Sequence, residues 1–458
     1  MDLKNNILET IGHTPLVKLN RVATETDSNV YAKIEFFNPG GSIKDRVGDY
    51  LVSKAEKSGK LKSGGTIVEA TSGNTGVGLA IAAAVRGYKC IFVMPDKMSE
   101  EKIQVLRAFG AKVVVTPTSV QPEDPRSYYS VARKLVEVTP NSFYANQYNN
   151  PDNPEIHYMT TGPEIWEQTG GKVDVLVAGV GTGGTISGIA KYLKEKNPKV
   201  QVIGVDPVGS LLADYKKTGV LGKTTKVYKI EGIGEDFLPD NVHFDLIDEF
   251  VQVNDKESFQ MCRELVIKEG VFAGVSCGSA VVGALKYAKK LKEKKNIVVV
   301  FPDGGSRYLS KAFNDSWMRE NGLLDSPLYI DTVRDLLASM PKASGDVVTA
   351  SHTDTVEQVI NRMKDKGISQ MPVFTEGELS GVIDEGDLIL PLCNGSIKPN
   401  DRILSFIKGS ALLVTLDDNL HKLADLFAKG YVALVKEEKQ KLRIITKIDF
   451  ISYMATRL

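Results

Sequence analysis

The alternation of short apolar runs with helical patterns between residues 29 and 302 is the feature that most constrains the fold. Strand-like runs occupy residues 30–34, 67–70, 90–94, 112–115, 173–178, 202–205 and 297–301. Helical patterns lie between them, among them 100–109, 127–136, 255–269 and 280–292. This order predicts an α/β fold with parallel sheets covered by helices, in which ligands bind at the carboxyl ends of the strands.

Lys44 stands at a position where a cation is electrostatically disfavoured. Pro39, Gly40 and Gly41 break the chain, Ser42 is a good N-cap residue, and the pattern after it predicts a helix over 45–57. Because the macrodipole opposes a cation in the first turn, a lysine there is either solvated or works as an amine nucleophile of lowered pKa. Taken alone, the position favours the solvated alternative, but two further loops favour the nucleophile.

Two loops rich in glycine, hydroxyl and amide residues each join a strand-like run to a helical run. Backbone N–H groups at such helix starts bind carboxylates and phosphates. For the first loop, an anion site and an ordinary capped turn are equally open. The first loop comprises Thr71, Ser72, Gly73, Asn74, Thr75 and Gly76, and the second comprises Gly179, Val180, Gly181, Thr182, Gly183, Gly184 and Thr185.

The second loop also matches the dinucleotide-binding pattern G-x-G-x-x-G. Asp206 ends the next strand-like run, where an acidic residue that binds a ribose is expected. A nicotinamide-dependent dehydrogenase is therefore an alternative. A cradle for a single phosphate explains the same glycines.

Composition and charge exclude several classes of partner. The 458 residues are enough for roughly three domains, and 57 basic residues balance 57 acidic ones, so neither nucleic acid nor an acidic membrane surface is indicated. No apolar run has membrane-spanning length. Four scattered cysteines predict free thiols, and five histidines lack metal-ligand spacing. With no signal-peptide pattern in residues 1–6, we expect a cytoplasmic protein without a metal site.

The last third of the chain repeats itself. Gly367 and Gly430 lie in similar segments 63 residues apart, and Asp387 and Asp449 are 62 residues apart. Each copy is predicted to run strand, helix, strand, strand, helix, which indicates a pseudo-symmetric module. We therefore expect a first domain over 1–325, a linker over 326–345, and a module over 346–458 with copies at 346–402 and 408–458.

These motifs, in this order, resemble one family. Residues 7 to about 318 are similar to the fold-type II pyridoxal 5′-phosphate enzymes of the cysteine synthase and cystathionine β-synthase group. The matching segments are 11–16, the Lys44 segment, both loops, 94–102 and 270–276. Residues 347–458 resemble a pair of regulatory CBS motifs, called a Bateman module. The resemblance implies pyridoxal 5′-phosphate as the cofactor.

The resemblance also implies roles for single residues. Lys44 would form a Schiff base with the cofactor and act as the catalytic base, Asn74 would hydrogen-bond its phenolic oxygen, and Ser276 would face its pyridine nitrogen. The cofactor phosphate would be held by Gly181, Thr182, Gly183, Gly184 and Thr185. The substrate would be held by Thr71, Ser72, Asn74, Thr75 and Gln147, with Gly232 and Tyr148 nearby. For Tyr148 and Tyr158, packing and a direct role are equally open.

Within the group, residues 232–237 resemble the cystathionine β-synthases, because cysteine synthases tend to have small residues where Glu235 stands. This implies that L-serine and L-homocysteine give L-cystathionine and water, with hydrogen sulfide release as a side reaction, in a homodimer or larger homo-oligomer. Few residues precede Ile11, so we expect no haem. The alternatives are a cysteine synthase that uses O-acetylserine and sulfide, and an adenosyl-ligand sensor with a non-catalytic core.

An effector site is expected in the repeated module. Thr446 and Asp449 fit the ribose-binding pattern of the family, which implies S-adenosylmethionine or, second, an adenine nucleotide as the ligand. In the first copy, Asp384 stands where Ser or Thr is usual. It either repels a nucleotide phosphate or is a solvated strand end, and both interpretations are open.

Overall fold

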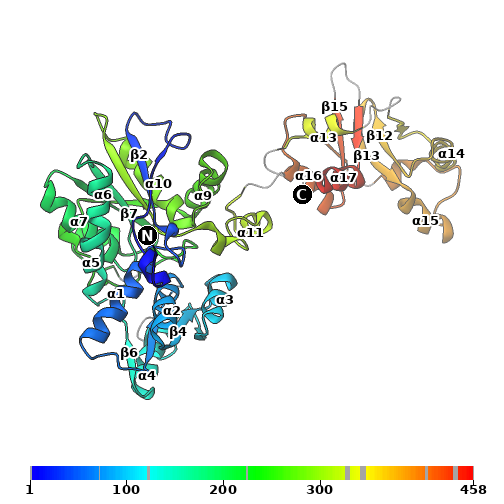
Figure 1. The fold of residues 1–458 in the computed structure, drawn as a ribbon. Helices are drawn as coiled ribbons and strands as arrows, with labels where there is room; N and C mark the ends of the chain where they lie inside the picture. Colours follow the sequence, from blue (N-terminus) through cyan, green and yellow to red (C-terminus); the bar gives the residue numbers. More distant parts are fainter. Residues whose placement is uncertain are drawn as a thin grey trace. The chain divides into compact units, whose positions relative to one another are not determined.

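A computed structural model describes residues 3–71, 73–120, 124–222, 225–324, 331–340, 347–407, 411–436 and 442–456. The chain divides into two compact units, Met1–Leu324 and Asp325–Leu458 (Figure 1). All four cysteines are unpaired. Within the described ranges, no helix has the length and apolar character needed to cross a membrane, and no group of three His, Cys, Asp or Glu side chains is arranged to hold a metal.

The larger sheet of the first unit has six strands in the order β1-β2-β10-β7-β8-β9. Only the pair formed by β1 and β2 is antiparallel. The strands are β1 (Leu16–Leu19), β2 (Asn29–Ile34), β7 (Val175–Gly179), β8 (Gln201–Pro207), β9 (Glu249–Val253) and β10 (Asn296–Phe301).

Helices cover both faces of this sheet, because successive residues of its strands point to opposite faces and each face packs against its own pair of helices. Val175 and Val177 pack into one core with α9 (Asp255–Glu269) and α10 (Val275–Ala288), whereas Leu176 and Ala178 pack into another with α6 (Gly162–Gln168) and α7 (Gly184–Lys196). Because both faces are buried, these strands are continuous apolar runs in the sequence. This is why they could be predicted.

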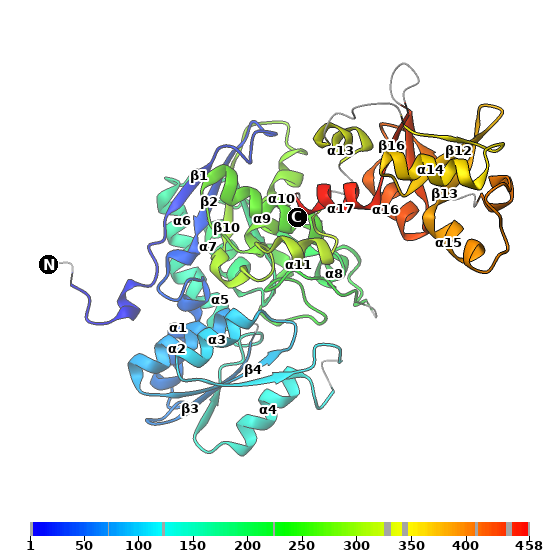
Figure 2. The same ribbon diagram turned by 90° about the vertical axis from the view of Figure 1, so that its right-hand side faces the viewer.

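The smaller sheet has four parallel strands in the order β5-β4-β3-β6. The strands are β3 (Thr66–Ala70), β4 (Lys89–Pro95), β5 (Lys112–Thr116) and β6 (Ser142–Tyr144). One face packs against α1 (Lys44–Lys57), α2 (Asn74–Arg86) and α3 (Glu100–Ala108), and the other packs against α4 (Tyr128–Val138). Figure 2 shows this layer below the larger sheet of the same unit.

Helices α1 and α2 approach so closely that glycine is required where they meet. A Cβ on Gly48 would overlap the carbonyl carbon of Gly78, and a Cβ on Gly78 would overlap the carbonyl oxygen of Lys44. The backbone contact therefore places the start of α1 next to α2, with Lys44 as its first residue.

A buried ion cluster joins the same end of α1 to the larger sheet. Arg46 Nε lies 2.8 Å from Glu35, and Arg46 Nη1 lies 2.6 Å from Glu164. Lys33, in β2, lies 2.7 Å from Glu164. Burial would raise the pKa of the Glu164 carboxyl, but its hydrogen bonds and ion pairs with Arg46 and Lys33 lower it to about 2. Helix α1 is thus attached to both layers.

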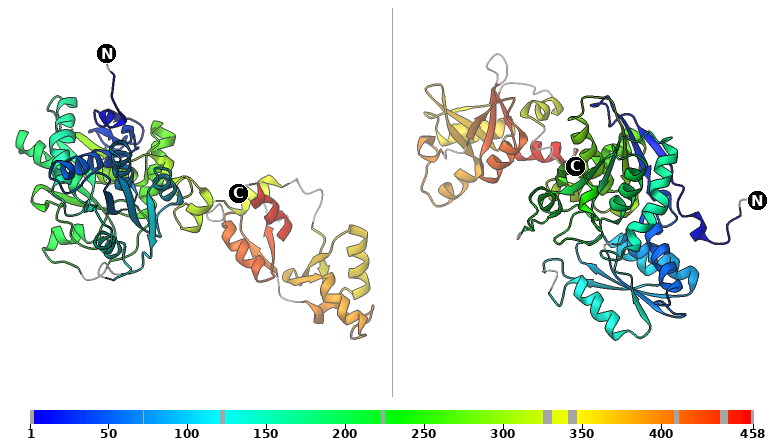
Figure 3. Two further views of the ribbon diagram at one scale, coloured as in Figure 1. Left: turned by 60° about the horizontal axis from the view of Figure 1, so that its bottom comes forward. Right: turned by 90° about the vertical axis from the view of Figure 1, so that its left-hand side faces the viewer.

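The second unit consists of two similar halves, side by side in Figure 3, each with a three-stranded sheet. In each half the first strand pair is parallel and the second antiparallel, which confirms the predicted repeat. The first half comprises β11 (Ala350–Ser351), α14 (Val356–Lys366), β12 (Gln370–Thr375), β13 (Glu378–Asp384) and α15 (Glu385–Cys393). The second comprises β14 (Ala411–Val414), α16 (Leu420–Ala428), β15 (Val432–Lys436), β16 (Leu442–Ile445) and α17 (Lys447–Ala455).

Helix α13 (Val333–Ser339) lies within the stretch expected to be a linker. Its Val333, Leu336 and Leu337 are buried in the core of the second half, together with residues of α16 and β15. This helix is therefore part of the second unit, and it completes the core of that half.

All seven predicted strands are present, and the elements that were not predicted are short. Strands β1, β6 and β9 have three to five residues, and α10 begins at Val275, earlier than expected. The remaining helices are α5 (Asp152–Ile156), a π-helical turn (His157–Thr161), α8 (Leu212–Thr218) and α11 (Asp315–Glu320). Periodicity is a weak signal over so few residues.

We expect Gly78→Ala to destabilise the first unit by about 2 kcal/mol, because the added methyl group overpacks the α1–α2 contact. Helix propensity alone would give the opposite sign, a gain of about 1 kcal/mol. Urea unfolding followed by tryptophan fluorescence measures the effect, since both tryptophans, Trp166 and Trp317, lie in this unit.

Ala84→Gly is the matched control, at an exposed position of the same helix. It should destabilise by about 1 kcal/mol through propensity alone. If Gly78→Ala stabilises the unit while Ala84→Gly destabilises it, the contact is not tight.

Candidate active site

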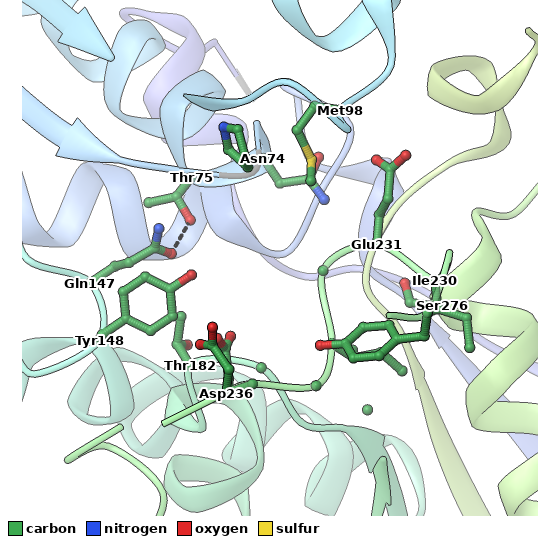
Figure 4. Close-up of a pocket in the computed structure, with 18 of the residues that line it drawn as sticks. Asn74, Thr75, Met98, Gln147, Tyr148, Thr182, Ile230, Glu231, Asp236 and Ser276 are labelled. Carbon is green, nitrogen blue, oxygen red and sulfur yellow. Dashed lines mark hydrogen bonds between the residues drawn. The ribbon is translucent and has the colours of Figure 1, made fainter. Parts of the chain in front are cut away.

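One cavity of about 240 Å³ lies at the carboxyl ends of strands from both sheets of the first unit. Figure 4 shows side chains from several elements around it, with Asn74 and Thr75 on α2 and Ser276 on α10. Most predicted site residues line this cavity: Lys44, Asn74, Thr75, Gln147, Tyr148, Gly181, Thr182, Gly183, Thr185, Gly232 and Ser276.

Three candidate site residues of the sequence analysis that the structure describes, Thr71, Gly184 and Tyr158, are not in this lining. Thr71 is fully buried, and its hydroxyl accepts hydrogen bonds from the backbone N–H groups of Gly73 and Gly76, so it shapes the loop. Gly184 lies against Asn153. The hydroxyl of Tyr158 donates to Glu195 at 2.8 Å, outside the cavity. Ser72 lies outside the described residues.

Lys44 combines a fixed backbone with an amine in the cavity. Its backbone N–H donates to Ser42 Oγ at 3.2 Å, but Ser42 is not the N-cap as predicted, because α1 begins directly after Ile43, which occupies that position. Burial lowers the pKa of the Lys44 amine to about 8, although the carboxylate of Asp303 acts in the opposite direction. About a tenth of this amine is therefore neutral, and so nucleophilic, at pH 7, which is roughly two hundred times the neutral fraction of an ordinary lysine.

The amide of Asn74 is oriented by two opposite charges. Its Nδ2 donates to Asp303 Oδ2 at 2.8 Å, and its Oδ1 accepts from Arg307. Arg307 also donates to the carbonyl of Gly40, and Tyr308 donates to Asp303 at 2.7 Å. The loop after β10 thereby holds the start of α2 in place.

Thr75 and Gln147 form a second pair on the cavity wall. The Thr75 hydroxyl donates to Gln147 Oε1 at 2.5 Å (Figure 4). Gln147 Nε2 donates to the carbonyl of Ala70. The backbone N–H of Gln147 donates to Glu69, whose pKa is raised to about 8 by burial. Both side chains have further donor or acceptor capacity toward the cavity.

The loop before α7 is shaped as a backbone cradle. A Cβ on Gly181 would lie 2.7 Å from the carbonyl oxygen of Gly232, and Gly183 has a φ of +84°. Side chains would therefore close this space or strain the chain. The first N–H groups of α7 have no partners within the helix and point to the space that the glycines leave open. The shape fits a small anion such as phosphate.

Tyrosines and two acids line the cavity beside the loop before α7, where a Cβ on Gly181 would lie 3.6 Å from Glu235 Oε1. The hydroxyls of Tyr128 and Tyr148 lie 3.2 Å apart, and the Tyr129 ring packs edge-on against Tyr148. Burial and the neighbouring Asp236 raise the pKa of Glu235 well above its usual value. No described residue forms an ion pair with Glu235. A cationic group placed here would therefore be stabilised by carboxylates and aromatic faces.

Asp206 does not take part in a dinucleotide site. It is fully buried at the end of β8, and its Oδ2 accepts from the backbone N–H of Ala213 at 2.9 Å, in α8. The carboxylate is thus used to hold α8 and does not line the cavity. The strand-end position expected for Asp206 is confirmed.

Sequence reasoning assigned no role to Asp303, Arg307 or the buried pair of Lys102 and Glu231. Lys102 Nζ lies 2.6 Å from Glu231 and 3.2 Å from the Tyr308 hydroxyl, and Glu231 lines the cavity. Asp303 follows the buried strand β10 almost directly, and that position was a usable signal. The other residues meet only through the tertiary fold.

In the second unit, the predicted effector residues cap a helix. Thr446 Oγ1 donates to Asp449 Oδ2 at 2.5 Å, and the two form a capping box at the start of α17. Asp384 and Asp387 form the equivalent box at α15. A carboxylate is favourable at a helix N-terminus, so Asp384 has a structural reason to be acidic.

Comparisons with known proteins agree on the family. The profile of the family described as pyridoxal-phosphate dependent enzymes matches residues 7–303, and that of the CBS domain matches residues 333–392. The chain is 41% identical over 470 residues to a cystathionine beta-synthase of Dictyostelium discoideum, across 99% of this chain and 92% of that protein.

Solved structures are similar to this chain as well, among them these two. An O-acetylserine dependent cystathionine beta-synthase from Helicobacter pylori is 42% identical, with a TM-score of 0.63, and the match covers 68% of this chain and 99% of that one. A hydrogen sulfide-producing enzyme from Fusobacterium nucleatum is 38% identical, with a TM-score of 0.62, covering 67% and 100%.

We expect Lys44 in the cofactor-free chain to react with an amine-acylating reagent at a rate that rises with pH and levels off above about pH 8, because only the neutral amine reacts. Asp303→Asn should shift this midpoint to lower pH, since the carboxylate favours the charged amine. Peptide mass spectrometry measures the rate at Lys44, and Lys44→Met identifies the peptide. A rate at Lys44 that still rises at pH 10 contradicts the lowered pKa.

Proposed function

The chain belongs to the pyridoxal-phosphate dependent enzymes and to their cystathionine β-synthase branch, and from this we propose that it condenses L-serine with L-homocysteine to L-cystathionine and water. One observation carries the proposal. A lysine amine of lowered pKa shares a single cavity with a phosphate-sized glycine cradle and an acidic, aromatic wall.

The cavity fits pyridoxal 5′-phosphate by its donor set and its shape. The backbone of residues 181–185 would hold the phosphate, with the hydroxyls of Thr182 and Thr185 adding donors. Lys44 would bind the aldehyde carbon, and Asn74 would bind the phenolic oxygen. Ser276 would offer the ring nitrogen a neutral hydroxyl. When bound, the cofactor withdraws electrons from the α-carbon of the substrate and so makes its proton acidic.

Different residues of the chain bind the substrate and transfer its proton. Thr75, Gln147 and the 71–74 loop hold the carboxylate of serine. Lys44, in its neutral form, takes the α-proton and later returns it to the same carbon. The hydroxyl of serine leaves as water with the proton of the thiol, and the new bond joins Cβ to sulfur. Atoms therefore balance without an oxidant or reductant.

The acidic side chains of Glu235 and Asp236 favour homocysteine over sulfide as the second substrate. Homocysteine brings an ammonium group that Glu235 and Asp236 would stabilise. Hydrosulfide is an anion, which Asp236 would repel and which would raise the pKa of the buried Glu235 further. A cysteine synthase, which uses sulfide, gains nothing from these two carboxylates. Hydrogen sulfide release, with cysteine in place of serine, follows from the same steps as a side reaction.

The test is product analysis with defined substrate pairs. We expect cystathionine from serine and homocysteine, and a lower kcat/KM with serine and sulfide. Glu235→Ala should lower kcat/KM for homocysteine about tenfold, since one hydrogen bond to a charged group is lost. The same change should not lower kcat/KM for sulfide. O-acetylserine in place of serine tests the leaving group.

Glu195→Ala is the control, because Glu195 lies outside the cavity and contacts only the Tyr158 hydroxyl among the site candidates. Lys44→Ala should abolish turnover with every pair. If Glu235→Ala lowers kcat/KM equally for homocysteine and for sulfide, Glu235 does not determine the preference for homocysteine. Cysteine formed in preference to cystathionine would identify a cysteine synthase instead.

We further propose that the second unit binds an adenosyl ligand, S-adenosylmethionine ahead of an adenine nucleotide. The CBS-domain match and the paired halves support this. Thr446 and Asp449 would bind the ribose with the lone pairs that capping leaves free. Asp384, at the matching place of the first half, disfavours a phosphate there. Ligand binding shifts activity only if its affinity differs between two states of the protein.

Calorimetry on the full chain with S-adenosylmethionine should show binding that Thr446→Ala removes. Thr355→Ala is the matched control: it breaks an equivalent capping box, with Gln358 at α14, and costs a similar ~1 kcal/mol of stability. It should leave ligand binding intact. If both variants lose binding equally, the loss comes from the broken helix cap and not from a lost ligand contact. If the wild type shows no heat of binding, S-adenosylmethionine is excluded as the ligand.

A further inference from the structure

His157 is a buried imidazole to which neither the sequence analysis nor the proposed reaction assigns a role. It is fully buried at the start of the π-helical turn between α5 and α6. π-Helical turns are rare and occur frequently at functional sites.

Both ring nitrogens of His157 have hydroxyl partners. Nδ1 lies 2.9 Å from Thr161 Oγ1, and Nε2 lies 3.3 Å from Thr185 Oγ1. Thr185 is the second residue of α7 and lines the cavity at the glycine cradle. The histidine therefore contacts the cradle from behind, through one threonine.

Close packing of α7 fixes this contact. Gly188 lies one turn after Gly184, and a Cβ on it would lie 2.8 Å from the Cβ of His157. A Cβ on Gly184 would overlap Asn153. Because both glycines lack side chains, α7 lies directly on residues 153–157, and the ring reaches Thr185 without an intervening water.

The ring is neutral at physiological pH. Burial lowers the pKa of His157 well below its usual value, and the positive charges of Lys44 and Arg46 lower it further, against the opposite effect of Glu164. A neutral imidazole has one donor and one acceptor. Two arrangements are then possible, and they differ in what Thr185 can offer the cavity.

In one arrangement Nε2 accepts the Thr185 proton, so only lone pairs of that hydroxyl remain for a ligand, and these repel an anion. In the other, the Thr161 hydroxyl donates to Nδ1, and Nε2–H donates to Thr185 Oγ1. The Thr185 proton is then available to an anion in the cradle.

We propose that His157 is a positioning residue that, as its Nε2–H tautomer, turns the Thr185 hydroxyl into a donor toward the cofactor phosphate. The relay runs from Thr161 through His157 and Thr185 to a phosphate oxygen. It adds a donor to the cradle without adding a charge. The inference rests on the proposed phosphate site at residues 181–185.

The first test measures the dissociation constant of pyridoxal 5′-phosphate for the cofactor-stripped full chain by fluorescence. Thr185→Val and His157→Asn should each weaken binding about tenfold or more, as for a lost hydrogen bond to a charged group. The double variant should be little weaker than either single variant, because both break one relay. His157→Gln, whose amide nitrogen can take the place of Nε2, should recover part of the affinity.

Tyr158→Phe is the matched control, at the next residue of the same turn, and should bind the cofactor as the wild type does. If His157→Asn does not fold, Thr161→Val gives the same test, since it removes the hydroxyl that donates to Nδ1 in the Nε2–H tautomer. The relay would be overturned if the losses of binding free energy in the two single variants add up in the double variant. It would also be overturned if a folded His157→Asn binds the cofactor with unchanged affinity.

The second test reads the tautomer directly. ¹⁵N NMR of the histidine rings, with the His157 signals assigned by their loss in His157→Asn, should show Nε2 protonated and Nδ1 unprotonated when the cofactor is bound. The opposite tautomer contradicts the proposal. A wild type that binds no pyridoxal 5′-phosphate at all would instead contradict the proposed function, so the two failures are distinguishable.

Discussion

The buried ion cluster around Arg46 is the interaction on which the site depends. Arg46 is two residues after Lys44 in α1, and its bonds to Glu35 and Glu164 attach that helix to the larger sheet. The backbone contact between Gly48 and Gly78 attaches the same helix to the smaller layer. The amine is thus held at the junction of two sheets, in a place where neither burial nor the helix dipole favours its charge.

The cavity that results is electrically asymmetric. Backbone N–H groups at the start of α7 favour an anion, and Glu235 with Asp236, beside the same glycine loop, favours a cation. Asp303 and Arg307, from the loop after β10, hold opposite ends of the Asn74 amide. Groups of opposite charge can therefore bind close together in a single cavity, which is what a reaction of two amino acids on one phosphorylated cofactor requires.

Prediction from the sequence succeeded where the signal is local. Strands buried on both faces are unbroken apolar runs, and the loops at Asn74 and Gly181 have glycine and hydroxyl residues next to each other in the chain. It was incomplete for Asp303, Glu231 and Lys102, which are far apart in the sequence and meet through side chains. Thr446 and Asp449 illustrate a third case, because the pattern that suggested a ribose site also forms an ordinary capping box.

The sequence by itself determined the α/β class, the repeated second unit, and the segments that contribute Lys44, Asn74 and the glycine cradle, because each depends on residues close together in the chain. Only the tertiary structure decided which of these residues share a cavity. It also decided that Asp206 is used to hold α8, and that His157 lies against Thr185. Such contacts join elements distant in the chain, and their geometry depends on helix packing that no local pattern encodes.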